Sequence, residues 1–259
     1  MITSNSNVQI KKLIKLQKSS KLRKEQNAFV IEGKKMFQEA KMLGIVEKVY
    51  VSETFYKEKE KYLEDIEYEI LTDNLLKEIS DTMTPQGVLA IVRKSEYHLK
   101  DLFSMKKGAF LFLEDVRDPG NVGTMIRTAE GAGIKGIILS KESVDVYNPK
   151  VVRSTMGSLF RMPLVYVEDF QNVLIQAKDS GVRLFATDLQ GKNNYDQEEY
   201  IGKCGIIIGN EANGISFGTK KNADIFVKIP MMGKVESLNA SVAAALMMYE
   251  VYRQDRKSN

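Results

Sequence analysis

The stretch IPMMGKVESLNASVAAALMMYE, from Ile229 to Glu250, decides how the C-terminal part of the chain folds. An apolar run from Ile225 to Pro230 predicts a buried strand, and a Met-Met-Gly loop follows it. Ser237, Leu238 and Asn239 then open a helix that is apolar on nearly every side. Open α/β sheets bind ligands where such a strand meets a helix, because polar side chains and free backbone N–H groups gather there. The stretch therefore predicts a binding site as well as a core.

The rest of the C-terminal part alternates apolar strand-like runs with helix-like segments. The other predicted strands are Phe110 to Leu113, Ile137 to Leu139, Val182 to Ala186 and Cys204 to Ile208. Continuous apolar runs joined by helices are typical of strands buried on both faces. We therefore predict an α/β fold with a Rossmann-like, mostly parallel sheet covered by helices on both sides.

The N-terminal part predicts a second, smaller α/β domain. Its strand-like and helix-like segments are Phe29 to Ile31, Lys34 to Leu43, Val46 to Val51, Tyr68 to Leu71, Asp73 to Ile79 and Val88 to Val92. A polar stretch from Arg93 to Lys107 reads as a linker, in which we expect His98 to be solvated. The expected domains are residues 1–97 and 108–259.

Composition excludes several kinds of chemistry. The chain has 259 residues, 43% of them hydrophobic and 28% charged, with one cysteine and one histidine. No zinc site of the usual Cys/His kind can be assembled from these, and Cys204 cannot form an internal disulfide. No apolar run approaches the length of a membrane span, and the N-terminus lacks a signal-peptide core. We expect a cytoplasmic protein without a metal or a membrane partner.

The first 24 residues carry a block of positive charge and no acidic residue. The block consists of Lys11, Lys12, Lys15, Lys18, Lys21, Arg23 and Lys24. Such a block attracts polyanions by displacing their counterions, which favours nucleic acid as the partner. A solvated, mobile tail is the alternative, and a membrane-surface helix is a weaker one because its apolar residues are few. Arg153, in the helical segment Asn148 to Phe160, is a second candidate contact, or part of a solvated helix face.

A literal GxGxxG occurs at Gly131, Gly133 and Gly136. A dinucleotide fingerprint must follow a strand and open a helix. Here the glycines follow a helical run and precede a strand, so we predict a helix C-cap and turn.

Two further clusters place polar residues after predicted strands. In the loop and helix from Glu114 to Glu130, Asn121 supplies an amide, and Arg127 can hold a phosphate or a developing oxyanion. In the second cluster, Gly205 to Ser216, a buried strand ends in Gly209, Asn210, Glu211, Asn213 and Gly214. Each cluster alone also fits an ordinary turn or a capping carboxylate.

In order and spacing, the three clusters together resemble the SpoU family of RNA ribose 2'-O-methyltransferases, a branch of the SPOUT superfamily. The matching motifs are NVGTMIR at 121–127, GNEANGI at 209–215 and IPMMGKVESLNASVA at 229–243. The segment FVIEGKKMFQEAKMLG, at 29–44, is similar to the family's N-terminal substrate-binding domain, which resembles ribosomal L30-type RNA binders.

The resemblance implies a deep trefoil knot, a homodimer through the C-terminal helix, and S-adenosylmethionine as the cofactor. The cofactor contacts it implies, mainly through backbone groups, are Thr187, Leu189, Gly209, Ile229, Met231 and Leu238. The catalytic residues it implies are Asn121, Arg127, Glu211, Ser237 and Asn239. It places Arg127 at the ribose hydroxyl. Because an arginine side chain stays protonated in proteins, it suits a cation that stabilises an alkoxide better than it suits a base. The expected RNA contacts are Lys11, Lys12, Lys15, Arg23, Lys24 and Arg153.

Three functions stay open from the sequence. The first is S-adenosylmethionine-dependent methylation of a ribose 2'-hydroxyl in RNA, with ribosomal RNA favoured over transfer RNA. The second is a non-catalytic RNA-binding or ribosome assembly protein on the same fold. The third is a nicotinamide-dependent oxidoreductase, which the misplaced glycines disfavour.

Overall fold

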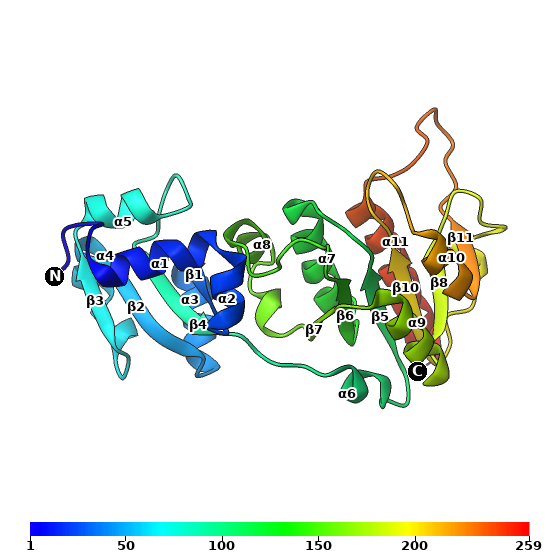
Figure 1. Ribbon diagram of the computed structural model, residues 1–259, viewed down its shortest axis with the longest axis horizontal. Coiled ribbons are helices and arrows are strands. Elements are labelled where there is room, and N and C mark those ends of the chain that lie inside the picture. Colours follow the sequence, from blue (N-terminus) through cyan, green and yellow to red (C-terminus); the bar gives the residue numbers. More distant parts are fainter. Residues whose placement is uncertain (259) are drawn as a thin grey trace. The chain divides into compact units, whose positions relative to one another are not determined.

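The computed structural model describes residues 1–258, which form two compact units (Figure 1). The first unit combines Met1–Ser95 with Asp145–Phe160, and the second combines Glu96–Val144 with the chain from Arg161 onward. A segment of 16 residues from the middle of the chain therefore belongs to the N-terminal unit (145–160). The polar stretch expected to be a linker also contains a short helix, α6 (Leu99–Phe103), with Leu102 and Phe103 buried.

The first unit is a small α/β fold around a four-stranded sheet of order β1-β4-β2-β3. The pairs β1/β4 and β2/β4 are antiparallel and β2/β3 is parallel. Its strands are β1 (Ala28–Glu32), β2 (Val46–Ser52), β3 (Tyr68–Leu71) and β4 (Val88–Arg93). Its helices are α1 (Val8–Lys18), α2 (Ser20–Glu25), α3 (Lys34–Met42), α4 (Glu53–Lys59), η1 (Glu60–Leu63), α5 (Asp73–Ile79), α8 (Pro149–Ser154) and η2 (Ser158–Phe160). The six segments predicted from the N-terminal sequence are all present.

The basic N-terminal block is folded, which removes the mobile-tail alternative. Asn7 caps α1 by accepting a hydrogen bond from the Gln9 amide. Ile10, Leu13 and Leu16 recur on one helical face and are fully buried in the core of the first unit. The lysines of α1 lie on the opposite, exposed side.

Arg23 is buried in the first unit, with only 2% of its surface exposed. Its Nε and Nη2 donate to Asp145 Oδ2 at 2.8 and 2.7 Å. Its Nη1 donates to the carbonyl oxygens of Leu16 and Gln17, each at 2.7 Å. The guanidinium thus joins the turn after α1 to the segment 145–160.

Among the described residues, the second unit forms a seven-stranded sheet of order β7-β6-β5-β10-β8-β11-β9, in which every pair is parallel. The strands are β5 (Gly108–Leu113), β6 (Gly136–Ser140), β7 (Leu164–Val167), β8 (Arg183–Thr187), β9 (Asn193–Asn194), β10 (Lys203–Ile208) and β11 (Ile225–Lys228). The remaining elements are α7 (Pro119–Gly131), α9 (Phe170–Asp179), η3 (Tyr195–Gln197), α10 (Phe217–Asn222) and α11 (Ala240–Ser258). The expected parallel sheet is confirmed.

The sheet is apolar on both faces because helices cover it on both sides. One core cluster includes Phe110, Phe112 and Leu184 from the strands and Phe170 and Leu174 from α9. On the other side of the sheet, α11 packs on β10 and also contacts the helix α7. No described helix is long and apolar enough to cross a membrane.

The glycines of the GxGxxG sequence end a helix, as predicted. Gly131 is the last residue of α7, Gly133 adopts the left-handed φ of 73°, and Gly136 begins β6. The Gly133 and Ile134 amides donate back to the carbonyls of Glu130 and Ala129, which closes the helix end.

Candidate active site

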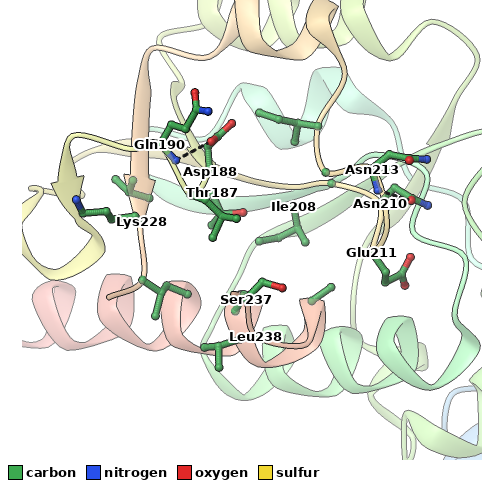
Figure 2. Close-up of a pocket in the computed structure, with 18 of the residues that line it drawn as sticks. Thr187, Asp188, Gln190, Ile208, Asn210, Glu211, Asn213, Lys228, Ser237 and Leu238 are labelled. Carbon is green, nitrogen blue, oxygen red and sulfur yellow. Dashed lines mark hydrogen bonds between the residues drawn. The ribbon is translucent and has the colours of Figure 1, made fainter. Parts of the chain in front are cut away.

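A pocket of about 400 Å³ opens at the carboxyl ends of β8, β10 and β11, over the start of α11 (Figure 2). Figure 1 shows the loop after β11, in orange, extending from this end of the second unit. All six residues expected to contact a cofactor line it: Thr187, Leu189, Gly209, Ile229, Met231 and Leu238. Of the five expected catalytic residues, Glu211 and Ser237 line the pocket, whereas Asn121, Arg127 and Asn239 lie outside its lining.

The loop after β10 is compact enough to exclude a side chain at Gly209. A Cβ there would lie 2.3 Å from the Gly214 carbonyl carbon and 2.5 Å from the Ile215 nitrogen, both backbone atoms. Asn210 organises the same loop, because its Oδ1 accepts from the Ala212 and Asn213 amides and its Nδ2 donates to the Asp115 carbonyl. The backbone is thus fixed and open to the pocket, which suits recognition of a ligand by main-chain groups.

A chain of side-chain hydrogen bonds connects the three motifs. Asn239 Nδ2 donates to Asn121 Oδ1 at 2.9 Å, and Asn121 Nδ2 donates to Glu211 Oε1 at 3.0 Å. Asn239 Oδ1 in turn accepts from the backbone and hydroxyl of Ser241, at the start of α11. Glu211 and Asn239, which follow Asn121 by 90 and 118 positions in the sequence, therefore meet at its side chain.

Glu211 is held as a carboxylate. Partial burial opposes its ionisation, but hydrogen bonds from Asn121 and from backbone amides outweigh burial and leave the Glu211 pKa below its ordinary value. The backbone donors are the amides of Arg117 and Asp118, at 3.4 and 3.3 Å. The carboxylate thus joins the loop after β10 to the loop before α7.

The first turn of α7 fixes the position of Asn121. Asp118 is the N-cap and accepts from the Asn121 amide at 2.7 Å, and Pro119 occupies the first helical position. The residues DPGN, at 118–121, are typical of a helix start, so the sequence alone could have identified Asp118 as the N-cap.

Arg127 lies two turns into α7 and is exposed. It has no ion pair with any described residue. Its guanidinium is thus available to an external anion, although it does not line the pocket.

The expected RNA contacts differ in exposure. Lys11, Lys12, Lys15 and Lys24 are exposed. Arg153 is partly buried and forms an ion pair with Asp81. The burial and the four hydrogen bonds of Arg23 argue against the expected contact with RNA, because its guanidinium is used within the first unit.

Sequence reasoning missed Asp188 and Lys220, which also line the pocket. Their side chains form an ion pair at 2.9 Å. Burial opposes ionisation of Asp188, but hydrogen bonds from Lys220 and the Gln190 amide leave the Asp188 pKa below its ordinary value. An aspartate directly after a predicted strand is a usable signal, whereas its pairing with a lysine 32 residues later is not readable from spacing.

The pocket suits an organic cofactor of mixed polarity. Its wall combines apolar side chains such as Ile208, Val227 and Leu238 with open backbone at Gly209 and one partly buried carboxylate–lysine pair. No group of His, Cys, Asp or Glu side chains among the described residues could hold a metal ion. The fold and site thus define an α/β cofactor-binding protein whose ligand lies at the carboxyl edge of a parallel sheet.

Residues 108–249 match the model of the SpoU rRNA Methylase family, and residues 7–90 match that of the MRM3-like substrate binding domain. The chain belongs to the SpoU rRNA methylase family, which confirms the resemblance drawn from the three motifs.

The chain is similar to curated relatives over most of its length. It is 32% identical to the 23S rRNA (guanosine(2553)-2'-O)-methyltransferase RlmP of Bacillus subtilis (strain 168), over 96% of this chain and 98% of that protein. It is 35% identical to a putative TrmH family tRNA/rRNA methyltransferase of Staphylococcus saprophyticus, over 65% of this chain and 70% of that one.

Solved structures agree with the fold of the whole chain. The AdoMet-bound rRNA methyltransferase of Sinorhizobium meliloti has a TM-score of 0.85 at 30% identity, with 97% of each chain covered. The SpoU methyltransferase AviRb of Streptomyces viridochromogenes, in complex with AdoMet, has a TM-score of 0.88 at 27% identity, with 96% of this chain and 98% of that chain covered.

Proposed function

We propose that this protein transfers a methyl group from S-adenosylmethionine to a ribose 2'-hydroxyl of ribosomal RNA. The observation that carries the proposal is the hydrogen-bonded chain Asn239–Asn121–Glu211, which joins all three motifs beside the pocket. Membership in the SpoU family and 32% identity to a 23S rRNA 2'-O-methyltransferase over nearly the whole chain support it. A ribosomal substrate also implies a cytoplasmic location.

The pocket residues would hold the cofactor through backbone and apolar contacts. Gly209, Ile229 and Leu238 would contact the adenosine part, with Thr187, Leu189 and Met231 completing the wall. When bound, S-adenosylmethionine supplies a methyl group already activated on a sulfonium centre. The protein's remaining task is to hold the ribose oxygen in line, about 3 Å from the methyl carbon.

The polar residues would position the RNA and stabilise the charge that develops on its oxygen. The Arg127 guanidinium would bind a phosphate beside the target and stabilise the negative charge that builds on the ribose oxygen as its proton leaves to water. The Ser237 hydroxyl lines the pocket, has no hydrogen bond to a described residue, and would accept one from the ribose hydroxyl. Asn121, Glu211 and Asn239 would fix the two loops that carry these groups.

The first unit would bind RNA through the exposed face of α1. Lys11, Lys12 and Lys15 present positive charge there without an acidic residue in the helix, and Lys24 is exposed on the following helix, α2. The match of residues 7–90 to a substrate binding domain supports this assignment. Arg153 stays a candidate RNA contact, although its guanidinium also forms an ion pair with Asp81.

We also propose a trefoil knot and a homodimer for the second unit. The fold shared with solved SpoU methyltransferases, at a TM-score of 0.88 for AviRb, supports the knot. For the dimer, the apolar helix α11 leaves one stripe exposed in the single chain, containing Val242, Tyr249 and Tyr252. A second copy would cover that stripe.

Loss of Arg127 should abolish methylation while leaving the cofactor site intact. We expect Arg127→Ala to lower kcat at least about 100-fold, because the developing negative charge loses its cation. The measurement is tritiated methyl transfer to rRNA from cells lacking the protein, with 2'-O-methyl mapping of both rRNA and tRNA to identify the substrate. Cofactor affinity, by calorimetry, should stay within about twofold.

The matched control is Arg183→Ala, at the amino end of β8 and hence at the opposite edge of the sheet. It should methylate at the wild-type rate. Substantial turnover by Arg127→Ala would contradict the role assigned to this residue.

A further inference from the structure

Large apolar side chains are exposed in the segments that supply the pocket, although only Leu189 among them lines it. They are Leu189, Phe217, Met232 and Val235, and each follows the carboxyl end of β8, β10 or β11. Lysines stand between them in the sequence, at positions 192, 220, 221, 228 and 234. Exposed apolar side chains interleaved with cations are the surface that single-stranded nucleic acid requires, because bases stack on the former and phosphates pair with the latter.

Phe217 is the aromatic member of this set, and most of its ring is exposed to solvent rather than packed in the core. It is the first residue of α10, with 72% of its surface exposed. The helix is anchored on its other side by the fully buried Thr219, whose hydroxyl donates to Glu114 at 2.8 Å. Glu114 also accepts from the Ser216 amide at 2.9 Å. The ring therefore contributes little to the core.

Two lysines share the helical face of Phe217, because they follow it by three and four residues. Lys220 lines the pocket and pairs with Asp188, whereas Phe217 and Lys221 lie outside the pocket lining on the same short helix. Lys221 lies over the Phe217 ring, with its Nζ 4.6 Å from the centroid. Because Lys221 covers one face of the ring, a base would stack on the opposite face, and its phosphate would find a cation on the same helix.

We propose that Phe217 and Lys221 form a stacking site for an unpaired base of the RNA substrate, next to the nucleotide that enters the pocket. This inference rests on the proposed function and adds a contact that selects the substrate. A flat, sequence-tolerant platform holds a splayed-out base without reading its edge, so it favours single-stranded loops over duplex.

The experiment compares Phe217→Ala with Phe217→Tyr, and with Ile175→Ala, which truncates an exposed apolar residue on α9. The probe is protein-free 23S rRNA from cells lacking the protein. We expect Phe217→Ala to raise KM roughly tenfold or more through lost stacking, with kcat changed less than about threefold. Phe217→Tyr should restore KM, and Ile175→Ala should leave it unchanged.

A second readout separates the lysine from the ring. Binding of a fluorescent single-stranded RNA to Lys221→Gln should show a salt slope, log Kd against log salt, smaller by about 0.7 for one lost phosphate contact. Cofactor affinity should not change in any variant. If wild-type protein methylates RNA but Phe217→Ala has the wild-type KM, the stacking site is overturned and the proposed function stands. If wild-type protein binds the cofactor but methylates no RNA, the proposed function fails first.

Discussion

Glu211 acts in this site through its charge more than its size. Its two oxygens accept hydrogen bonds from Asn121 and from the amides of Arg117 and Asp118. In Glu211→Gln an NH₂ group replaces one oxygen and faces these donors. Because hydrogen bonds to charged groups are worth about 1.5–3 kcal/mol, we expect methylation to fall roughly 10- to 100-fold. Glu236→Gln, at an exposed glutamate of the loop after β11, should retain full activity.

The same carboxylate links stability to pH. Its lowered pKa means that its contribution to the free energy of unfolding is fully present above the ordinary value of 4.5. The contribution is lost as the pH falls through the lowered value. Urea unfolding of wild type and Glu211→Gln should therefore differ at pH 7 and converge in more acidic buffer. A difference that does not depend on pH would contradict this account.

At the scale of elements, the loop after β10 depends on close backbone packing. Gly209→Ala would place a methyl group 2.3–2.5 Å from the backbone of Gly214 and Ile215, so the loop must shift. We expect a loss of about 1–3 kcal/mol in stability and at least about tenfold weaker cofactor binding by calorimetry. Gly233→Ala is the matched control, because its Cβ meets no atom within 4 Å. Equal cofactor affinity in the two variants would count against a main-chain binding site.

Elements with a strong apolar pattern in their own sequence were predictable. Elements that depend on contacts with distant parts of the chain were not. The buried strands and the turn at Gly131 and Gly133 follow from apolar runs and the order of elements. Helix α1 carried a signal in Ile10, Leu13 and Leu16, but the lysines between them left a mobile tail open as the alternative. The two residues of β9 form a strand only because β11 lies beside them.

The site shows the same division. Gly209, Ile229, Met231 and Leu238 belong to two of the motifs, and Thr187 and Leu189 follow the predicted strand Val182 to Ala186; parallel strands bring these segments to one edge of the sheet. The exposed position of Arg127 and the ion pair of Asp188 with Lys220 depend on packing across the fold. The burial of Arg23 depends on Asp145, which lies 122 residues away in the chain. No local pattern encodes a partner at that distance.

At the scale of the whole molecule, the exposed stripe of α11 predicts a stable dimer. Sedimentation velocity at about 10 µM should show a dimer for the wild type. Val242→Arg combined with Tyr249→Arg should shift it to monomer, because two charges would have to be buried in the interface. Ile175→Arg, an equally exposed apolar site on α9, should leave the dimer intact. A wild-type monomer at this concentration would refute the assembly.

The ion pair between Arg23 and Asp145 limits which segments can be exchanged between related proteins. A chimera that replaces only residues 1–95 inherits the native segment 145–160, with Asp145 facing a foreign surface. If the incoming sequence lacks an arginine at the position of Arg23, a carboxylate loses its partner, and breaking a buried pair costs about 3–5 kcal/mol. Grafting a new substrate specificity onto this scaffold therefore requires transplanting two discontinuous pieces of chain together.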